Sequence, residues 1–506
     1  MAAADRATLA DNLSLGAAKR RLFASPDWAV AALVVFGATL AWATCVRLPI
    51  LSSEGMDEAF YAEVAHLWTR GVLPYAGAFD VKPPGYFALL ALSQSLFGAS
   101  LGSLRAISVV SDATTAAALF FIGCAMGSRT LGAFAALVSP PLSALVTNND
   151  CYPVLAAFTT LAFLPVFHAS AIMKRAATAG LIIGAACTIK QTAAFEALGL
   201  LAIFLRSTEA AGGRARVALA FCLSAAVAPL VFLIYFAALG AAGPLIADTV
   251  FSALQRPALD QGFFTGLMLF APVQRVIAPT VVVAFLALLR RRAIEESAPD
   301  SRIAAVAIWL ACATCGVLAQ HMVYQNYLGP MLSPLILLAG AGARWGLPEF
   351  ARAAPALRLA VIGLATVSTA LYWRIGHFAR PIDAAPIAEA SRMILASGPR
   401  STDKLLAIDF GGWSNVETDL APPTPFFHRM HLLCSFPAAG PSRLAEALAA
   451  RPRYVIVGEY LNAHSRCDGP DAWPLVKPAL DASYRLLGHV AGKVQSFDIY
   501  RADPSR

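Results

Sequence analysis

Charged side chains are scarce in this sequence. Only 14% of its 506 residues are Asp, Glu, Lys or Arg, whereas 58% are hydrophobic. Soluble domains carry about 25% charged residues, and so few charges cannot cover a soluble surface of this size. The composition excludes a soluble globular enzyme, a disordered chain and a nucleic-acid-binding domain. It predicts an all-α polytopic membrane protein.

Cysteine is present, but without the spacing of a metal site. Seven of the nine cysteines lie in or next to apolar runs. Cys312 and Cys315 form a CxxC pair, but inside an apolar run this pair favours packing over redox chemistry. The other two, Cys434 and Cys467, lie in a polar C-terminal region, where an oxidising compartment would permit a disulfide between them.

The net charge of +8 is unevenly distributed. Residues 376–506 contain 14 basic and 13 acidic residues, whereas the first 375 residues contain 25 and 18. The basic excess therefore lies in the apolar part, where cytoplasmic loops are rich in Lys and Arg. It carries information about topology, and we expect no nucleic-acid partner.

Long apolar runs give the expected spans. They cover residues 28–47, 105–126, 131–147, 152–171, 178–206, 216–240, 272–289, 303–320, 328–343 and 357–373. The run 178–206 is interrupted at Lys190 and Gln191, so we divide it into two short helices that meet outside. The run 84–98 is too short to span and is expected to lie along the membrane surface. These assignments predict 11 transmembrane helices.

Basic residues orient these spans. Lys19, Arg20 and Arg21 precede the first run and keep the N-terminus in the cytoplasm, and we expect no cleavable signal. The C-terminus is then outside. The expected parts are a cytoplasmic segment 1–27, a membrane domain 28–375 with a first external loop 48–104, and an extracytoplasmic domain 376–506.

The C-terminal region contains the pattern of a small α/β domain. Short apolar runs at 405–409, 454–458 and 496–500 predict strands. Residues 442–450 predict a helix with Ser442 as its N-cap. About 130 residues suffice for a separate core.

The first external loop gathers carboxylates just outside the first span. They are Glu54, Asp57, Glu58 and Glu63. Glu58, Ala62, Ala65 and Trp68 fit one face of a short amphipathic helix on the bilayer, with Asp57 near its N-terminus. A carboxylate at the membrane edge serves as a general base or binds a metal. Helix capping with a solvated acidic face explains the same pattern.

Two cations lie at the same depth. Lys82 precedes two prolines, which stiffen the chain and hold an ammonium at the water–lipid boundary. This position suits a lipid phosphate, although snorkelling to a headgroup also explains it. Arg105 opens the second span and adds charge there. Seven residues later, on the same helix face, Asp112 requires either an ionic partner or a cavity.

Three further segments reach the same membrane face. Asp150 lies in a tight second loop, where capping of the next helix is sufficient to explain it. Lys190, Gln191 and Glu196 lie at a break between apolar segments, and such breaks usually line a cavity. A polar and aromatic cluster begins another span, and part of it fits interface anchoring. Its members are Gln320, His321, Tyr324, Gln325, Asn326 and Tyr327.

These segments resemble the GT-C membrane glycosyltransferases, in particular the protein O-mannosyltransferase and lipid A aminoarabinose transferase group. The first-loop runs 57–61 and 80–84 carry the most specific likeness. Weaker likenesses lie at 149–150, 189–192, 321–330 and 444–459. Asp80 stands one position away from the family's usual Asp directly before Lys, so it receives no firm role.

The resemblance implies an enzyme that takes its sugar from a polyprenyl-phosphate donor and works at the periplasmic or external face of a bacterial inner membrane. It implies inversion by direct displacement. Asp57 would activate the acceptor hydroxyl with Glu58 beside it, and Lys82 and Arg105 would bind the donor phosphate. The site would be shaped by Asp150, Lys190, Gln191, His321, Tyr324 and Tyr327.

Several features stay open at this stage. The acceptor is a lipid such as lipopolysaccharide, a glycan or a protein, and the external domain is expected to select it. The resemblance leaves a divalent metal at Asp57 and Asp150 open, because family members differ in metal dependence, and the sequence establishes no cofactor. The alternative function is a transporter or flippase of a lipid-linked or anionic solute, which broken helices and intramembrane charges also fit.

Overall fold

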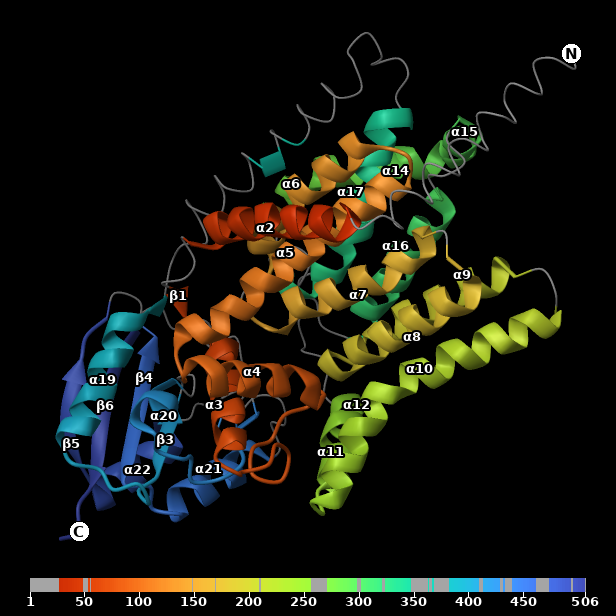
Figure 1. The fold of residues 1–506 in the computed structure, drawn as a ribbon. Helices are drawn as coiled ribbons and strands as arrows, with labels where there is room; N and C mark the ends of the chain where they lie inside the picture. Colours follow the sequence, from red (N-terminus) through yellow and green to blue (C-terminus); the bar gives the residue numbers. More distant parts are fainter. Residues whose placement is uncertain are drawn as a thin grey trace, which may run out of the picture.

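The computed structural model of the chain combines a helical bundle with a smaller α/β domain at one end (Figure 1). It describes residues 27–48, 53–54, 56–147, 149–168, 170–208, 211–255, 271–297, 302–320, 324–346, 363, 366–367, 382–408, 413–427, 431–432, 439–460, 473–492 and 495–505. Cys434 and Cys467 lie outside these residues. Of the expected N-terminal segment 1–27 only residue 27 is described, and of the expected span 357–373 only residues 363, 366 and 367 are.

The bundle contains helices and short helical turns. In chain order these are α2 (Asp27–Arg47), α3 (Met56–Thr69), α4 (Pro84–Phe97), α5 (Leu101–Ala125), α6 (Arg129–Val146), α7 (Cys151–Phe167), α8 (Ile172–Ile189), α9 (Ala193–Arg206), α10 (Ala211–Ala238), α11 (Ala242–Ile246), the π-helical η2 (Ala247–Ser252), α12 (Ala253–Gln255), α14 (Ala271–Leu289), α15 (Arg291–Ser297), α16 (Ile303–Leu318), the 3₁₀ turn η4 (Gln325–Leu328), α17 (Gly329–Ala341) and the π-helical η5 (Gly342–Gly346).

These helices support the expected membrane protein. Within the described ranges, α2, α5, α6, α8 and α10 are long and apolar enough to cross a membrane, and α7, α16 and part of α14 are shorter apolar helices. The helical membrane architecture is therefore confirmed, whereas the number of 11 spans and their orientation stay predictions.

Two boundaries in the bundle are informative. The predicted break at Lys190 and Gln191 separates α8 from α9. However, α8 begins at Ile172 rather than at 178. Its first turn contains Lys174 and Arg175, which lie before the apolar run and therefore outside the expected span. Helix α4 has 14 residues, so it is about 21 Å long and too short for a hydrocarbon core of about 30 Å.

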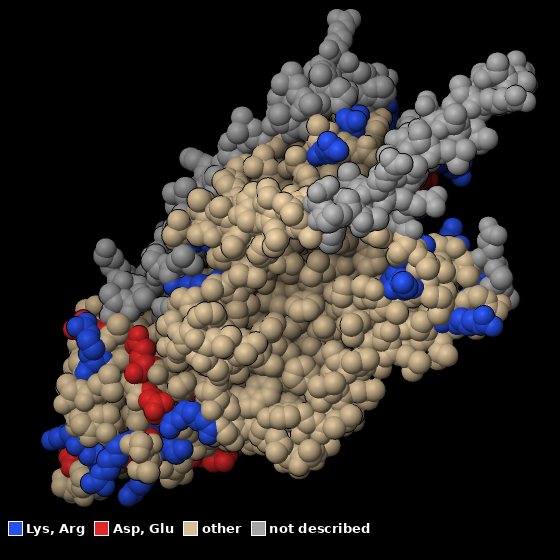
Figure 2. Space-filling model, viewed as in Figure 1, with Lys and Arg blue, Asp and Glu red and all other residues tan. Residues whose placement is uncertain are grey.

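The bundle has two chemically different ends. A broad face without charged side chains separates them, and Lys and Arg gather at the end farther from the α/β domain (Figure 2). Arg129 begins α6, Lys174 lies in the first turn of α8, and Arg206 ends α9. The starts of α7 and α9 and the turn η4 therefore lie at the opposite end, nearer the α/β domain.

The α/β domain is built on a four-stranded sheet. Its strands are β3 (Leu405–Ile408), β4 (Tyr454–Tyr460), β5 (Tyr484–Val490) and β6 (Gln495–Ala502), in the order β3-β4-β6-β5. β3 and β4 are parallel, with Leu405 opposite Tyr454, and the other pairs are antiparallel. The three predicted strands are present, and β5 is a fourth. In addition, β1 (Ser53–Glu54) of the first loop pairs with β2 (Ile382–Asp383).

Helices cover both faces of this sheet, because alternate residues of a strand point in opposite directions. Leu406 and Val455 pack against α21 (Gly440–Ala449) and α22 (Trp473–Ser483) in one apolar core. Leu405 and Ile456 belong to a second core with α19 (Ala384–Ala396) and α20 (Trp413–Thr418). That second core continues through α3 into the membrane helices, so the two parts of the chain share it.

Two local expectations are wrong. Ser442 is not the N-cap of its helix: α21 begins at Gly440, and the Ser442 hydroxyl donates to the carbonyl of Ala439. Helix α3 is not a helix with one face open to solvent and lipid. Its side with Phe60 and His66 meets the α/β domain, where the Phe60 and Phe427 rings are 5.2 Å apart and Asp419 accepts from His66 and from Arg70 just after the helix. Domain packing therefore buries most of α3.

Candidate functional site

The predicted residues converge where α3, α4, α7 and α9 begin. Asp57 is exposed in the first turn of α3. Asp150 is the N-cap of α7, and Lys190 ends α8. Backbone amides at a helix N-terminus favour nearby negative charge, so this end of the bundle suits carboxylates and anionic ligands.

Lys82 is held by the first loop. Its backbone amide donates to Asp80 Oδ1 at 2.8 Å, and its ammonium lies 3.8 Å from the same oxygen. The ammonium also lies 4.4 Å from the centre of the Tyr61 ring. Burial, with the charges of Asp57 and Asp80, raises the pKa of Tyr61 well above its usual value. Lys82 therefore lies against the Tyr61 ring, the charge of Asp57 acts on the same tyrosine, and Asp80 positions the lysine.

Asp150 is fixed on both sides. Its Oδ1 accepts the backbone amide of Tyr152 at 2.9 Å, which confirms the predicted cap, and its Oδ2 accepts the side-chain amide of Asn326 at 2.7 Å. Burial raises the pKa of Asp150 to about 6, hydrogen bonds from Asn326 and Tyr152 lower it, the charge of Asp57 raises it and that of Lys190 lowers it. Asp57, Asp150 and Lys190 thus form one electrostatic group.

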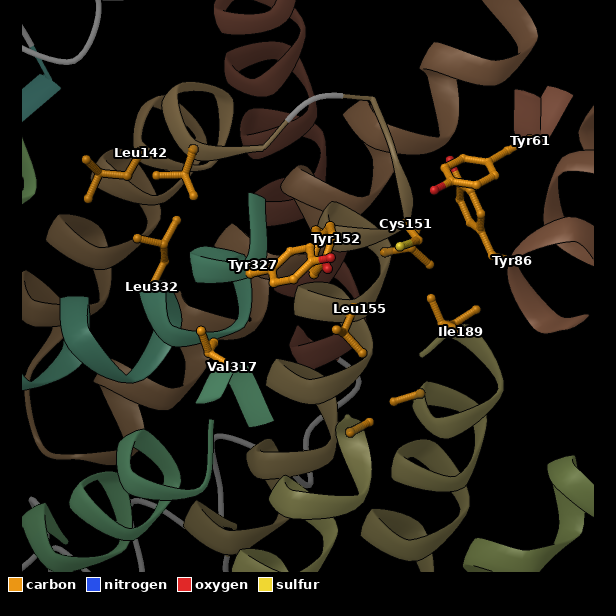
Figure 3. Close-up of a cluster of buried hydrophobic side chains, with 14 of the residues drawn as sticks. Tyr61, Tyr86, Leu142, Cys151, Tyr152, Leu155, Ile189, Val317, Tyr327 and Leu332 are labelled. Atoms are coloured by element: carbon orange, nitrogen blue, oxygen red, sulfur yellow. The ribbon is translucent and has the colours of Figure 1, made fainter. Parts of the chain in front are cut away.

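Lys190 lies in an aromatic cage. Its ammonium donates to the Tyr152 hydroxyl and lies 4.2 Å and 4.3 Å from the ring centres of Tyr152 and Tyr327. Such contacts stabilise a buried ammonium. Tyr324 packs edge-on against Tyr327 at 5.4 Å. In Figure 3 Cys151 lies between the pair Tyr152 and Tyr327 and the pair Tyr61 and Tyr86.

Gln191, at the break between α8 and α9, forms hydrogen bonds with two other segments. Its amide donates to the carbonyls of Val81 at 2.7 Å and Thr249 at 2.8 Å. Val81 immediately precedes Lys82, and Thr249 lies in η2, which joins the long loop after α10 to the site. The break between α8 and α9 therefore helps to set the position of the first loop.

Glu58 and Arg105 are paired with each other. The Arg105 Nε donates to Glu58 Oε1 at 2.8 Å, and both side chains are buried. The contact joins α5 to the first turn of α3, at the residue that follows Asp57. It accounts for Arg105 as a positioning group, and its predicted binding of the donor phosphate stays a prediction.

Other expectations have different outcomes. His321 lies outside the described residues. In the part of the chain that the structure describes, no three His, Cys, Asp or Glu side chains are grouped to hold a metal ion. Metal dependence at Asp57 and Asp150 therefore stays a prediction, and the mechanism below needs no metal step.

Sequence reasoning assigned no role to two residues that the structure brings to this end, Asn326 and Arg47. Asn326 was visible only as part of a polar cluster, and its partner Asp150 is 176 positions away. Asp112 does have an ionic partner: Arg47 Nε lies 2.7 Å from its Oδ2. Arg47 itself is the last residue of the apolar run 28–47, where a basic residue is typical of an ordinary helix end.

No family model matches the sequence, and no curated protein matches it. Solved structures do. ArnT from Cupriavidus metallidurans bound to undecaprenyl phosphate matches with a TM-score of 0.64 and 14% identity, over 94% of this chain and 98% of its own. The arabinofuranosyltransferase AftD from Mycobacteria gives 0.55 and 15%, over 94% and 40%. The Archaeoglobus fulgidus oligosaccharyltransferase tethered with an acceptor peptide gives 0.50 and 12%, over 92% and 73%.

Identities this low bear on the fold rather than on the reaction. The similarity to ArnT extends over nearly the whole of both chains, so it includes the α/β domain as well as the helical bundle. The chain therefore has the GT-C fold that these membrane glycosyltransferases share, as its first-loop resemblance predicted.

Proposed function

We propose that this protein is a membrane glycosyltransferase that moves a hexosyl or pentosyl group from a polyprenyl-phosphate donor to an acceptor hydroxyl. The reaction takes place on the external or periplasmic face of the inner membrane. The fold supports the reaction class, and a solved structure of similar fold, ArnT, contains undecaprenyl phosphate.

One arrangement carries the proposal. The Lys82 ammonium lies 4.4 Å from the centre of the Tyr61 ring, and the charge of Asp57 acts both on this tyrosine and on Asp150. A cation for a phosphate and a carboxylate for a hydroxyl are the two groups that this transfer requires. Both are at the end of the bundle nearer the α/β domain, where a lipid donor could present its head group.

The step is a single displacement. The acceptor oxygen attacks the anomeric carbon while its proton passes to the Asp57 carboxylate. The bond from that carbon to the phosphate oxygen breaks, and its electron pair remains on the phosphate. Lys82 stabilises the added negative charge on the departing polyprenyl phosphate. The anomeric configuration inverts, because attack and departure occur on opposite faces.

The remaining residues have supporting roles in this proposal. Asp150 and Lys190 shape the acceptor side of the site through their mutual attraction. Gln191 holds Val81, and therefore Lys82, against the helix break. The rings of Tyr324 and Tyr327 form the wall of the site with Tyr152. His321 belongs to the same polar segment in the sequence.

The decisive experiment uses a panel of polyprenyl-phosphate-linked monosaccharides with acceptor extracts, and compares purified wild type with Asp57→Asn. Turnover of one donor by wild type alone supports the enzyme class and the base. Equal turnover by both proteins retains the class and rejects Asp57 as base. Failure of folded wild type with every donor and extract rejects the transferase and favours transport.

A further inference from the structure

Helix α5 makes two buried ion pairs on one face, each toward a different part of the site. Arg105 and Asp112 are seven residues apart, so they lie on the same face about 10 Å apart along the axis. Arg105 contacts Glu58, and Asp112 contacts Arg47. All four side chains have at most 3% of their surface exposed.

The first pair leads directly to Asp57. Glu58 follows Asp57 in the first turn of α3, and its carboxylate accepts from Arg105 at 2.8 Å. Since a guanidinium is planar and rigid, this contact fixes the start of α3 relative to α5.

The second pair leads to Asp150 through a network. Arg47 donates from Nη1 to Asn149 Oδ1 at 3.2 Å and from Nη2 to Thr147 Oγ1 at 3.0 Å. The Ser143 hydroxyl closes the network by donating to Asp112 Oδ1 at 2.6 Å. Thr147 and Asn149 belong to the tight loop that ends at Asp150, so Arg47 holds this loop against α5.

We propose that α5 sets the relative position of Asp57 and Asp150 through these two pairs, with Arg47, Asp112 and Asn149 as positioning residues. This inference rests on the proposed function. A buried ion pair adds little net stability compared with apolar packing, so the geometry it imposes is its main effect. A displacement of about 1 Å between reacting groups costs as much as 100-fold in rate.

Asn149→Ala tests this without disturbing the ion pairs. It removes one of the two contacts that Arg47 makes with the loop, keeps the other at Thr147, and leaves the Arg47–Asp112 pair and the Asp150 side chain unsubstituted. We expect kcat to fall by about 10- to 100-fold while the donor KM and the melting temperature stay near wild type. Thr160→Val is the matched control, because Thr160 lies within α7, the helix that Asp150 caps, and the change removes its buried 2.8 Å hydrogen bond with Ser333, away from the loop.

A second variant excludes a purely structural explanation. Asp112→Asn alone would leave Arg47 buried without its counter-charge, and the chain could then fail to fold. The double variant Arg47→Met with Asp112→Leu removes both charges together and should fold. We expect it to lose kcat as Asn149→Ala does, and to retain stabilisation by undecaprenyl phosphate.

Each outcome decides one question. Wild-type kcat in Asn149→Ala or in the double variant overturns the positioning role, and the proposed transfer is unaffected. An equal loss of kcat in Thr160→Val also overturns it, because removal of any buried hydrogen bond of α7 would then lower kcat. If wild type transfers no sugar and is not stabilised by undecaprenyl phosphate, the proposed function fails and this inference fails with it.

Discussion

Asn326 donates its side-chain amide to Asp150 across 2.7 Å and joins the turn before α17 to the cap of α7. This bond stabilises the ionised form of Asp150 and therefore lowers its pKa, against the larger effect of burial. A carboxylate that titrates at about pH 6 can change charge within a physiological range.

The Asp150 titration gives a pH prediction. If the ionised form is required, kcat/KM of wild type falls as the pH drops through about 6. Asn326→Ala removes a donor to the carboxylate, so the pKa of Asp150 rises and the acid limb moves to higher pH. Profiles of initial rate from pH 5 to 8 measure this. A limb at the same pH in both proteins would show that Asp150 does not control it.

Asp57→Asn should lower kcat by about 10²- to 10⁴-fold, the usual contribution of a general base. Asp57 is exposed, so the loss of its favourable interaction with the N-terminus of α3 costs only about 0.3–1 kcal/mol. Donor turnover and thermal melting should be measured together. Asp481→Asn, an exposed Asp in the α/β domain, is the control for charge removal.

Lys82→Gln should weaken binding of polyprenyl phosphate by about 10- to 100-fold, because a hydrogen bond to a charged group contributes about 1.5–3 kcal/mol. Equilibrium binding of undecaprenyl phosphate measures this directly. Lys477→Gln removes an exposed lysine from the α/β domain and should bind as wild type does. Equal affinity in Lys82→Gln and wild type would contradict the role of Lys82 at the phosphate.

Glu63 gives a stability prediction. It is fully buried in α3, and among the described residues neither carboxyl oxygen has a hydrogen-bond partner. Burial raises its pKa well above its usual value, with Arg70 lowering it and Asp419 raising it. The protonated form is therefore favoured in the folded state, and its stabilising contribution is complete below the unfolded pKa and is lost as the pH rises through the folded pKa.

Glu63→Gln replaces this carboxyl with a neutral group of the same shape. We expect a higher melting temperature than wild type at pH 8 and a smaller difference at pH 5. Melting curves at the two pH values test this. A difference that is larger at pH 5 would mean that the ionised form of Glu63 is the one that the fold stabilises.

Local sequence signals predicted much of this structure. The apolar runs found the long helices, and Asp150 could be assigned as a cap because its partner is only two residues away. The break at Lys190 and Gln191 was visible because two polar residues interrupt one run. Each of these features depends on neighbours in the chain.

Long-range pairing could not be predicted in this way. Arg47 and Asp112 are 65 residues apart, and Arg105 and Glu58 are 47 apart, so no periodicity connects them. Asp112 required a partner or a cavity, but the choice depended on how α2 packs beside α5. For α3, amphipathicity indicated a polar side without indicating whether lipid, water or a domain would cover it.

The contact of α3 with the α/β domain limits how the chain can be divided. Phe60, His66 and Arg70 all have partners in that domain, and β1 of the first loop forms a sheet with β2. Removing the domain would therefore expose the helix that carries Asp57. The two regions are not independent modules, and a chimaera made to change acceptor choice would have to exchange the first loop and the C-terminal domain as one unit.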